Sequence, residues 1–245
     1  MNDKNRAGFL AGVSDENTHY YDITDSTSSR LKELARKGAP EGSVVIADSQ
    51  TDGRGRLGRS FESPAGRGVY MSVLLRPDCG ASEAVSLTAL SACAVCRAIE
   101  SCCGVIPDIK WVNDLLIDGR KICGILCESE LGADGKMRFA VIGIGLNVSG
   151  GIADFSPPLR EKAGSLFSQS GVSVSRRELC AHIRSELMSL YEQWKKDHRC
   201  CLDEYRRRCV TVGNTVSVRT AHGEKCGTVA AIADDYSLVF EEQEK

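Results

Sequence analysis

The strongest constraint on the fold is a pair of apolar runs joined by Asp118-Gly119. Residues 109–117 and 121–127 flank this dipeptide and are rich in isoleucine and leucine. Asp-Gly between two such runs is a strong signal for a β-hairpin, because both positions of its tight turn require positive φ. Residues 136–148 form a further apolar run, rich in valine and isoleucine. The centre of the chain is therefore predicted to be a β-sheet built around this hairpin.

Three helices are predicted beside this sheet. The first begins at Asp25-Ser26-Thr27-Ser28 and ends at Gly38, a residue type that favours helix C-termini. The second covers residues 82–103, whose many small side chains predict close packing. The third begins at the capping-box pattern Ser175-Arg176-Arg177-Glu178. An apolar stripe at helical spacing follows that pattern, and core packing is its simplest interpretation. The stripe consists of Leu179, Ile183, Leu187, Leu190 and Trp194.

The remaining elements are short strands. They are predicted at residues 44–47, 69–75, 215–220, 227–232 and 236–240. Residues 155–166 are expected to be irregular. This pattern indicates an α+β fold, a mixed β-sheet backed by helices with a small all-β unit after it. We expect a flexible segment at residues 1–19, a main domain at 20–208 and a small C-terminal β-barrel at 209–245.

Composition narrows the class of protein. The 245 residues carry a formal net charge of −2, which does not favour a dedicated nucleic-acid binder. The N-terminus lacks the apolar core of a secretory signal, and no apolar run reaches the length of a membrane span. The twelve cysteines include the adjacent pairs Cys102-Cys103 and Cys200-Cys201, which argues against a disulfide framework. We expect a cytoplasmic protein in which most cysteines, Cys93-Ala94-Val95-Cys96 included, are buried hydrophobes.

A loop of alternating glycine and arginine is the first candidate for chemistry. Gly53-Arg54-Gly55-Arg56-Leu57-Gly58-Arg59 combines a backbone that can approach a ligand closely with side chains that bind phosphate or carboxylate. It is not a Walker A loop, because no Gly-Lys-Ser/Thr follows. The pattern favours a loop that closes over an anion, while a flexible surface loop and an RNA-binding arginine tract stay open as alternatives.

Two lysines of the predicted hairpin are the second candidate. Lys110 lies in Lys110-Trp111-Val112-Asn113-Asp114, and Lys121 begins Lys121-Ile122-Cys123-Gly124-Ile125-Leu126. On paired strands the two ammonium groups could meet at one ligand, and a bound anion would offset the cost of burying them. Two exposed lysines on a solvent-facing hairpin are the alternative.

The third candidate is Gly143-Ile144-Gly145-Leu146-Asn147-Val148 at the end of the long strand. Glycine weakens a strand and often marks a place where a ligand comes close. A tightly packed strand that ends in a turn-forming asparagine explains the same residues equally well.

Together, these motifs resemble those of the biotin protein ligases in order and spacing. The resemblance covers about residues 18–240. It implies a mixed sheet backed by helices, shared with lipoate ligases and related to class II aminoacyl-tRNA synthetases, followed by a small C-terminal β-barrel. It also implies the activity, in which biotin is activated with ATP and Mg²⁺ to biotinyl-5'-AMP and then transferred to a lysine of a biotin carboxyl carrier domain.

The resemblance carries over to individual residues. Ser26, Thr27 and Gln50 match positions beside biotin, and Arg54, Gly55 and Arg56 match the segment that orders over biotin and the adenylate. Lys121 matches the lysine that meets the biotin carboxylate and the α-phosphate, and we expect it to act in catalysis with Arg54 and Arg56. The nucleotide side is expected to comprise Arg56, Arg59, Phe61, Lys110, Trp111, Asn113, Asp114 and Asn147, with Asp114 and Asn147 weakly holding Mg²⁺ through ATP.

The sequence departs from the family's pattern at several points. Ser28, Phe61 and Val112 stand where Asn, Trp and Pro are usual, which we interpret as tuning of affinity. No segment for the helix-turn-helix domain of family repressors precedes the first motif, so a monofunctional ligase that does not bind nucleic acid is expected, as a monomer or a homodimer. The closing hairpin of the family's barrel is expected to be missing. A lipoate or octanoate ligase, a non-catalytic biotin sensor and an RNA-binding protein are the competing interpretations.

Overall fold

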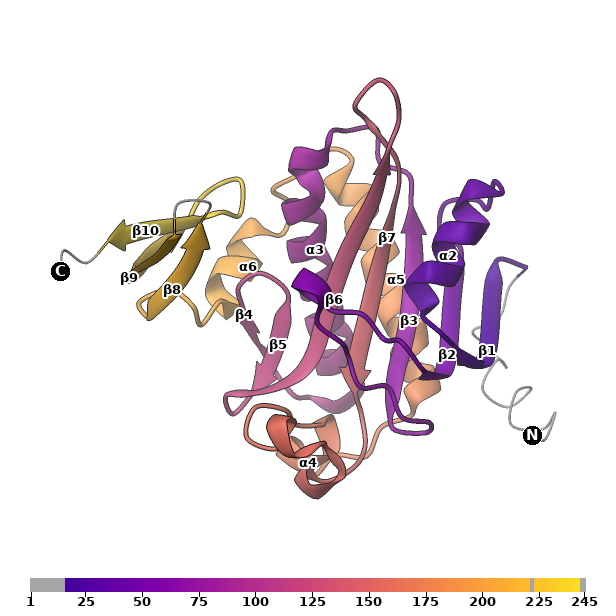
Figure 1. Cartoon of the computed structure of the whole chain (residues 1–245), viewed down its shortest axis with the longest axis horizontal. Coiled ribbons are helices and arrows are strands. Elements are labelled where there is room, and N and C mark those ends of the chain that lie inside the picture. The colour runs from indigo at the N-terminus through magenta and orange to yellow at the C-terminus, as the bar shows by residue number, and fades with distance from the viewer. Residues whose placement is uncertain (1–15, 221–222, 243–245) are drawn as a thin grey trace.

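A seven-stranded mixed sheet organises the computed structural model, which describes residues 16–220 and 223–242 (Figure 1). The strand order is β1-β2-β3-β7-β6-β5-β4. Its strands are β1 (Thr18–Thr24), β2 (Val44–Gln50), β3 (Gly68–Leu75), β4 (Asp108–Lys110), β5 (Asp114–Ile117), β6 (Arg120–Leu131) and β7 (Met137–Asn147). β1 and β2 are parallel, and every other neighbouring pair is antiparallel. The predicted mixed sheet is confirmed.

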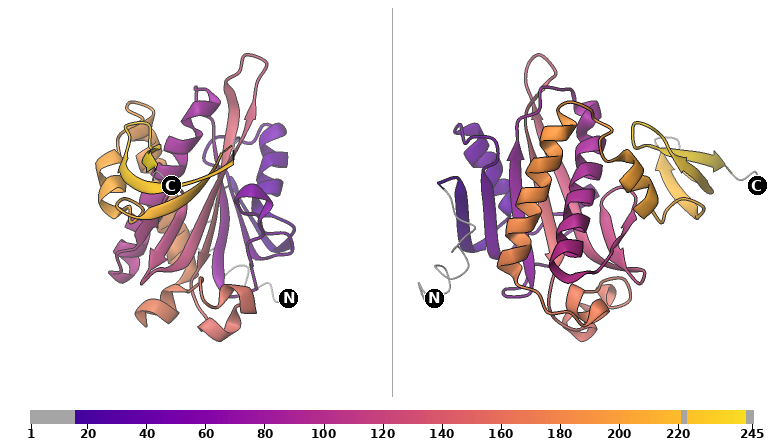
Figure 2. Two further views of the ribbon diagram at one scale, coloured as in Figure 1. Left: turned by 60° about the vertical axis from the view of Figure 1, so that its left-hand side comes forward. Right: turned by 180° about the vertical axis from the view of Figure 1, so that it is seen from behind.

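Helices cover the two faces of the sheet unequally (Figure 2). α3 (Ala84–Cys103) and α5 (Arg176–Trp194) pack side by side on one face, which we call the helix face. The short α2 (Thr27–Arg36) lies on the other face together with the arginine–glycine loop, so we call this the loop face. The remaining helical segments are η1 (Arg56–Gly58), η2 (Ala81–Glu83), η3 (Ile152–Asp154), η4 (Pro157–Leu159), α4 (Leu166–Ser170) and α6 (Leu202–Arg208).

Alternation along β7 shows how the sequence assigns side chains to the two faces. Ala140, Ile142 and Ile144 belong to the large core under α3 and α5, whereas Phe139 and Val141 belong to the small core under α2. Because side chains alternate along a strand, the later odd-numbered residues of β7 also point to the loop face. Residues 143, 145 and 147, the two glycines and the asparagine of the third motif, therefore share that face.

The helix face holds the larger core. The predicted apolar stripe of α5 is fully or almost fully buried, so its interpretation as core packing is confirmed. Residues 81–103 are long and apolar enough to resemble a membrane span, but 72% of their most apolar window is buried in the fold, as expected for a core helix. Ser175 caps α5 by accepting a hydrogen bond from the Glu178 N–H, as the sequence predicts.

Three structural expectations need correction. Residues 18 and 19, assigned to a flexible segment, lie in β1, whereas residues 1–15 of that segment are outside the described residues. The run 109–117 is not one strand, because a turn at residues 111–113 divides it into β4 and β5. The described C-terminal residues form an open three-stranded sheet rather than a closed barrel. Its strands are β8 (Thr215–Thr220), β9 (Gly223–Ile232) and β10 (Leu238–Glu242), in the order β10-β9-β8.

The hairpin turn behaves as predicted. Asp118 and Gly119 have φ values of 49° and 74°, and both lie in the left-handed region. Ile117 pairs with Arg120 directly across the turn. The tight turn fixes the register of β5 against β6, and with it the position of Lys121 near the beginning of β6.

Candidate functional site

A cluster of hydroxyl and amide groups lies where α2 meets the sheet. The Gln50 side-chain oxygen accepts hydrogen bonds from the Thr27 N–H at 2.9 Å and from the Thr27 hydroxyl at 3.2 Å. The Gln50 side-chain nitrogen donates to the Ser63 hydroxyl at 2.8 Å. Ser26, the N-cap residue of α2, is buried beside Thr27. Three residues predicted to lie next to biotin are thus brought together at one end of the loop face.

Ser72 is a member of this cluster that the sequence reasoning missed. Its hydroxyl lies 2.8 Å from that of Thr27 and 3.0 Å from that of Ser28, and all three are buried. A Cβ on Gly143 would come within 2.6 Å of the Ser28 hydroxyl oxygen. Glycine at position 143 therefore makes room for the Ser28 side chain. A serine within the otherwise apolar strand at residues 68–75 was the sequence signal that could have identified Ser72 as a member of the cluster.

The arginine–glycine loop, defined here as residues 53–59, forms a tight turn above the sheet. The Gly55 N–H donates to the Arg59 carbonyl at 2.7 Å, and Leu57 adopts a left-handed φ of 57° with its side chain 88% exposed. Residues 52–60, together with Leu126 and Glu128 of β6, line a pocket of about 430 Å³. Arg54, Arg56 and Arg59 are all exposed. The predicted basic loop therefore borders a cavity large enough for a small molecule.

Arg56 joins this loop to the turn between β4 and β5. Its guanidinium donates to the Asn113 side-chain oxygen at 3.0 Å. The Asn113 side-chain nitrogen donates to the Ile125 carbonyl at 2.8 Å, and the Ile125 N–H donates to the Asn113 carbonyl at 2.9 Å. Since the Ile125 carbonyl can only accept, the amide must direct its oxygen toward Arg56. Asn113 is thus fixed by β6 and presents an acceptor to the loop.

Phe61 lies over a floor made by two glycines. Gly124 of β6 and Gly145 of β7 are directly opposite each other in the sheet. A Cβ on Gly145 would come within 2.6 Å of the Phe61 ring, and one on Gly124 within 3.5 Å. Any larger side chain at Gly145 would displace the ring. Gly145 is therefore required by the close approach of Phe61, which also contacts Tyr70 edge to face at 6.4 Å. The tightest neighbour of a Cβ on Gly124 would instead be Lys121 Nζ, at 3.0 Å.

Lys121 pairs with a carboxylate beside this floor. Its Nζ lies 2.7 Å from Asp114 Oδ1, although the direction of approach does not make a regular hydrogen bond to that buried oxygen. The two side chains are 35% and 26% exposed, so the pair is open to a ligand. Lys121 is held through its backbone by residues 162–164, since its N–H donates to the Lys162 carbonyl and its carbonyl accepts from Gly164.

Lys110 and Lys121 do not lie on paired strands, although both are next to Asp114. The expectation that the two lysines come from paired strands is wrong, because β5 lies between β4 and β6. Lys110 lies in β4, opposite Asp114 of β5, and its side chain is exposed. The turn at residues 111–113, which the sequence did not reveal, inserts this additional strand.

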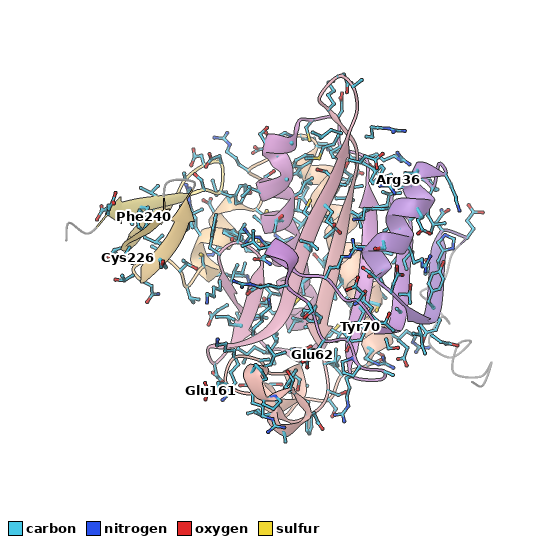
Figure 3. The ribbon with its side chains drawn as sticks, viewed as in Figure 1. Arg36, Glu62, Tyr70, Glu161, Cys226 and Phe240 are labelled. Carbon is cyan, nitrogen blue, oxygen red and sulfur yellow. The ribbon has the colours of Figure 1, made fainter. Side chains whose placement is uncertain are left out.

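Asn147 and Trp111 have partners within the fold. The Asn147 side chain donates to the Gly164 carbonyl at 3.0 Å, and with Glu62 and Tyr70 it lines a small cavity of about 30 Å³. Figure 3 shows Glu62 and Tyr70 near that end of the sheet. The Trp111 ring N–H donates to the Tyr236 carbonyl at 2.8 Å. Trp111, predicted on the nucleotide side, is therefore bonded to the C-terminal part of the chain.

The buried thiols are unsuited to act as nucleophiles. Burial raises the pKa of Cys96 and Cys123, and it raises that of Cys180 to about 12. Such thiols stay protonated at neutral pH and are poor nucleophiles. Cys93 and Cys96 are fully buried in α3, and the described part of the chain contains no group of three His, Cys, Asp or Glu residues placed to hold a metal ion.

Along β7, the site runs from Gly143 through Gly145 to Asn147 on the loop face. Four residues of strand span about 13 Å. The hydroxyl and amide cluster lies at the Gly143 end, and Phe61 and the Lys121 ammonium lie in the middle, over Gly145 and Gly124. At the other end Gly164 joins the Asn147 side chain to the Lys121 backbone. This is an elongated site for a ligand with a polar, uncharged head and an anionic tail.

Known proteins match this chain in sequence and fold. A family model described as the biotin/lipoate A/B protein ligase family matches residues 20–147. The bifunctional ligase/repressor BirA of Bacillus spizizenii is 36% identical over 98% of this chain and 74% of its own length. The biotin–acetyl-CoA-carboxylase ligase of Mycobacterium tuberculosis is 31% identical over 86% of this chain and 78% of its own.

Solved structures agree on the fold. A biotin protein ligase from Aquifex aeolicus in complex with biotin and ATP superposes with a TM-score of 0.77 at 24% identity, covering 94% of this chain and 96% of that one. The sequence match extends over more than half of the chain and includes all three motifs. The chain belongs to the biotin/lipoate A/B protein ligase family.

Proposed function

We propose that this chain is a biotin protein ligase, an ATP-dependent, AMP-forming enzyme. It converts biotin and ATP to biotinyl-5'-AMP and then transfers biotin to a lysine of a biotin carboxyl carrier domain of a carboxylase. The observation that carries this proposal is the arrangement of the arginine–glycine loop, with a neutral hydroxyl and amide cluster at one end of the site and the Lys121 ammonium further along it, over Gly124. Support also comes from relatives named as biotin–acetyl-CoA-carboxylase ligases.

The cluster end of the site suits the ring of biotin. A ureido group needs donors and acceptors without charge, and the side chains of Ser26, Thr27 and Gln50 supply both. An apolar chain would run beside the Phe61 ring, which covers the glycine floor, toward Lys121. The carboxylate would then displace the Asp114 carboxylate from Lys121, because both are anions that compete for one ammonium group.

The first half-reaction joins two anions. A carboxylate oxygen of biotin attacks the α-phosphorus of ATP, a new P–O bond forms, and the bond to pyrophosphate breaks. Lys121, Arg54 and Arg56 offset the repulsion between the partners and stabilise the charge that develops on phosphorus. Mg²⁺ enters with ATP as part of the substrate. Phe61, Asn113 and Asn147 are assigned to the nucleotide side, with Arg59 and Lys110 at its exposed edge.

The second half-reaction needs no protein nucleophile. The amine of the acceptor lysine attacks the acyl carbon, the C–N bond forms, and AMP leaves with the electrons of the acyl–oxygen bond. The adenylate is a mixed anhydride that water would hydrolyse. The arginine–glycine loop, hinged at Gly53, Gly55 and Gly58, closes over it and excludes water. We assign the reaction to the cytoplasm, with the protein acting as a monomer or homodimer.

Biotin-dependent exchange of labelled pyrophosphate into ATP tests the first half-reaction. We expect exchange with biotin and none without it. Octanoate and lipoate in place of biotin distinguish this proposal from a ligase for those acids, because the polar cluster would have no partner on a hydrocarbon chain. Exchange with octanoate alone, or binding of biotin with no exchange, would overturn the assignment.

A further inference from the structure

The turn between β4 and β5 is held from the C-terminal side of the chain. The Trp111 N–H donates to the Thr211 hydroxyl at 2.8 Å, and the Trp111 ring N–H donates to the Tyr236 carbonyl at 2.8 Å. The Tyr205 hydroxyl donates to the Val112 carbonyl at 3.1 Å, and this bond is buried. Three hydrogen bonds from α6 and the segments after it therefore fix two consecutive residues of one turn.

The same turn continues into Asn113, whose side chain accepts the hydrogen bond from Arg56. The Val112 carbonyl belongs to the peptide bond between Val112 and Asn113. The hydrogen bond from Tyr205 to this carbonyl therefore also restrains the backbone of Asn113. A continuous set of contacts thus runs from Tyr205 through Val112 and Asn113 to the arginine–glycine loop.

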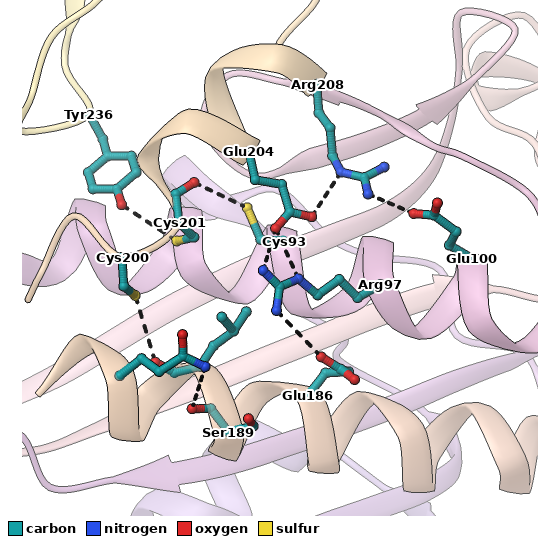
Figure 4. A network of polar contacts seen from close by, with 12 residues as sticks. Cys93, Arg97, Glu100, Glu186, Ser189, Cys200, Cys201, Glu204, Arg208 and Tyr236 are labelled. Carbon is teal, nitrogen blue, oxygen red and sulfur yellow. Dashed lines mark hydrogen bonds and ion pairs between the residues drawn. The ribbon is translucent and has the colours of Figure 1, made fainter.

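α6 is a rigid base for Tyr205. Glu204 accepts hydrogen bonds from Arg97 of α3 at 2.6 and 2.9 Å, and Arg208 donates to Glu100 of α3 at 2.7 Å (Figure 4). The Tyr205 ring is fully buried and packs edge to face on Tyr236, with ring centroids 5.6 Å apart. These contacts hold the Tyr205 side chain in place. Its hydrogen bond therefore restrains the position of the Val112 carbonyl.

We propose that Tyr205 is a positioning residue for the arginine–glycine loop, acting through Val112 and Asn113 on Arg56. In this role the C-terminal part of the chain sets how readily the loop orders over a ligand, without touching the ligand. This role of Tyr205 rests on the proposed function only in that biotin is taken as the ligand that the loop covers.

Limited proteolysis with trypsin measures this directly, because Arg54, Arg56 and Arg59 are exposed cleavage sites in the loop. Tyr205→Phe removes the hydroxyl and keeps the ring. We expect loop cleavage to be faster in the unliganded variant, and the biotin concentration that protects the loop to rise roughly tenfold, as for the loss of one buried hydrogen bond. In pyrophosphate exchange the KM for biotin should rise more than kcat falls.

Tyr236→Phe is the matched control. It also removes a buried tyrosine hydroxyl, one that bonds to the His198 carbonyl at 3.2 Å and lies 3.5 Å from the Cys201 thiol, but it keeps the backbone carbonyl that holds Trp111. A purely structural role predicts that the two variants behave alike. The proposal requires that only Tyr205→Phe change loop cleavage and KM at a comparable loss of thermal stability.

Thr211→Val provides a second variant, because it removes the acceptor of the Trp111 N–H and should share the effect of Tyr205→Phe. Loop cleavage equal to wild type in both variants would overturn the proposal. This result is separable from a failure of the proposed function. Cleavage of the unliganded loop is measured without biotin or ATP, whereas a failed function would appear as no biotin-dependent exchange in the wild-type protein.

Discussion

At the scale of single residues, the proposed chemistry depends on a few cationic side chains that exchange a partner within the protein for an anionic ligand. Lys121 is paired with Asp114, and Arg56 is bonded to Asn113. Both cations therefore already lie at the site, which reduces the cost of assembling them around an anion. The glycines opposite each other in β6 and β7 make room for Phe61 between these charged groups.

Replacing Lys121 by alanine should slow adenylate formation by about 100-fold or more, because the meeting anions lose a charged donor. Biotin-dependent pyrophosphate exchange measures the rate. Lys136→Ala is the control, since Lys136 is an exposed lysine that pairs only with Asp78 at the surface. Exchange in Lys121→Ala within a few-fold of wild type would remove Lys121 from its assigned role.

Gly145→Ala should destabilise the protein by about 1–3 kcal/mol, since its methyl group would overlap the Phe61 ring. Adding Phe61→Ala should recover part of this loss, because the clash needs both partners. Thermal unfolding of the two single variants and the double variant measures the coupling. Strictly additive effects would show that Phe61 does not rest on Gly145.

At the scale of elements, the sequence predicted those with strong local signals. Asp118-Gly119 specified the hairpin, and the apolar stripe from Leu179 to Trp194 specified α5, because turn chemistry and helical periodicity are local properties. β1 was missed because Thr18–Thr24 contains no apolar run, although Tyr20, Tyr21 and Ile23 favour strands and the segment pairs in parallel with β2. The turn at residues 111–113 was also missed, because it depends on hydrogen bonds to residues that are distant in sequence. These are Tyr205, Thr211 and Tyr236.

The junction between β2 and α5 should respond to pH through Glu41. Burial raises the pKa of its carboxyl, but hydrogen bonds from Lys195, the Arg76 N–H and Tyr191 outweigh burial and hold the pKa below its usual value of 4.5. A lowered pKa in the folded state stabilises the fold above pH 4.5, and this contribution is lost as the pH falls through the folded-state pKa.

Glu41→Gln should therefore lower the free energy of unfolding by about 1 kcal/mol at pH 7, a modest value because solvent screens the partly exposed pair with Lys195. Urea unfolding at several pH values measures the difference from wild type. The difference should shrink below pH 4.5. A difference that stays constant down to pH 3 would mean that the charge on Glu41 is not the stabilising feature.

At the scale of the whole molecule, the site lies on one face of a sheet whose other face packs against α3 and α5. The three motifs are far apart in sequence but converge on the loop face, because β3, β7 and β6 are neighbours and their side chains alternate. Motif order predicted that these segments belong to one site, while the roles of their individual residues stay predictions. Ser72, Tyr205 and Thr211 were missed, because their roles arise only when distant segments meet.

Transfer of biotin to a carrier domain tests the central claim most directly. The protein would be incubated with a biotin carboxyl carrier domain, biotin and Mg·ATP, and the carrier followed by intact mass spectrometry. We predict that the carrier gains the mass of one biotinyl group, that the gain requires ATP, and that it disappears when the acceptor lysine is replaced by arginine. A carrier of unchanged mass, in the presence of an active control ligase that modifies the same preparation, would contradict the account.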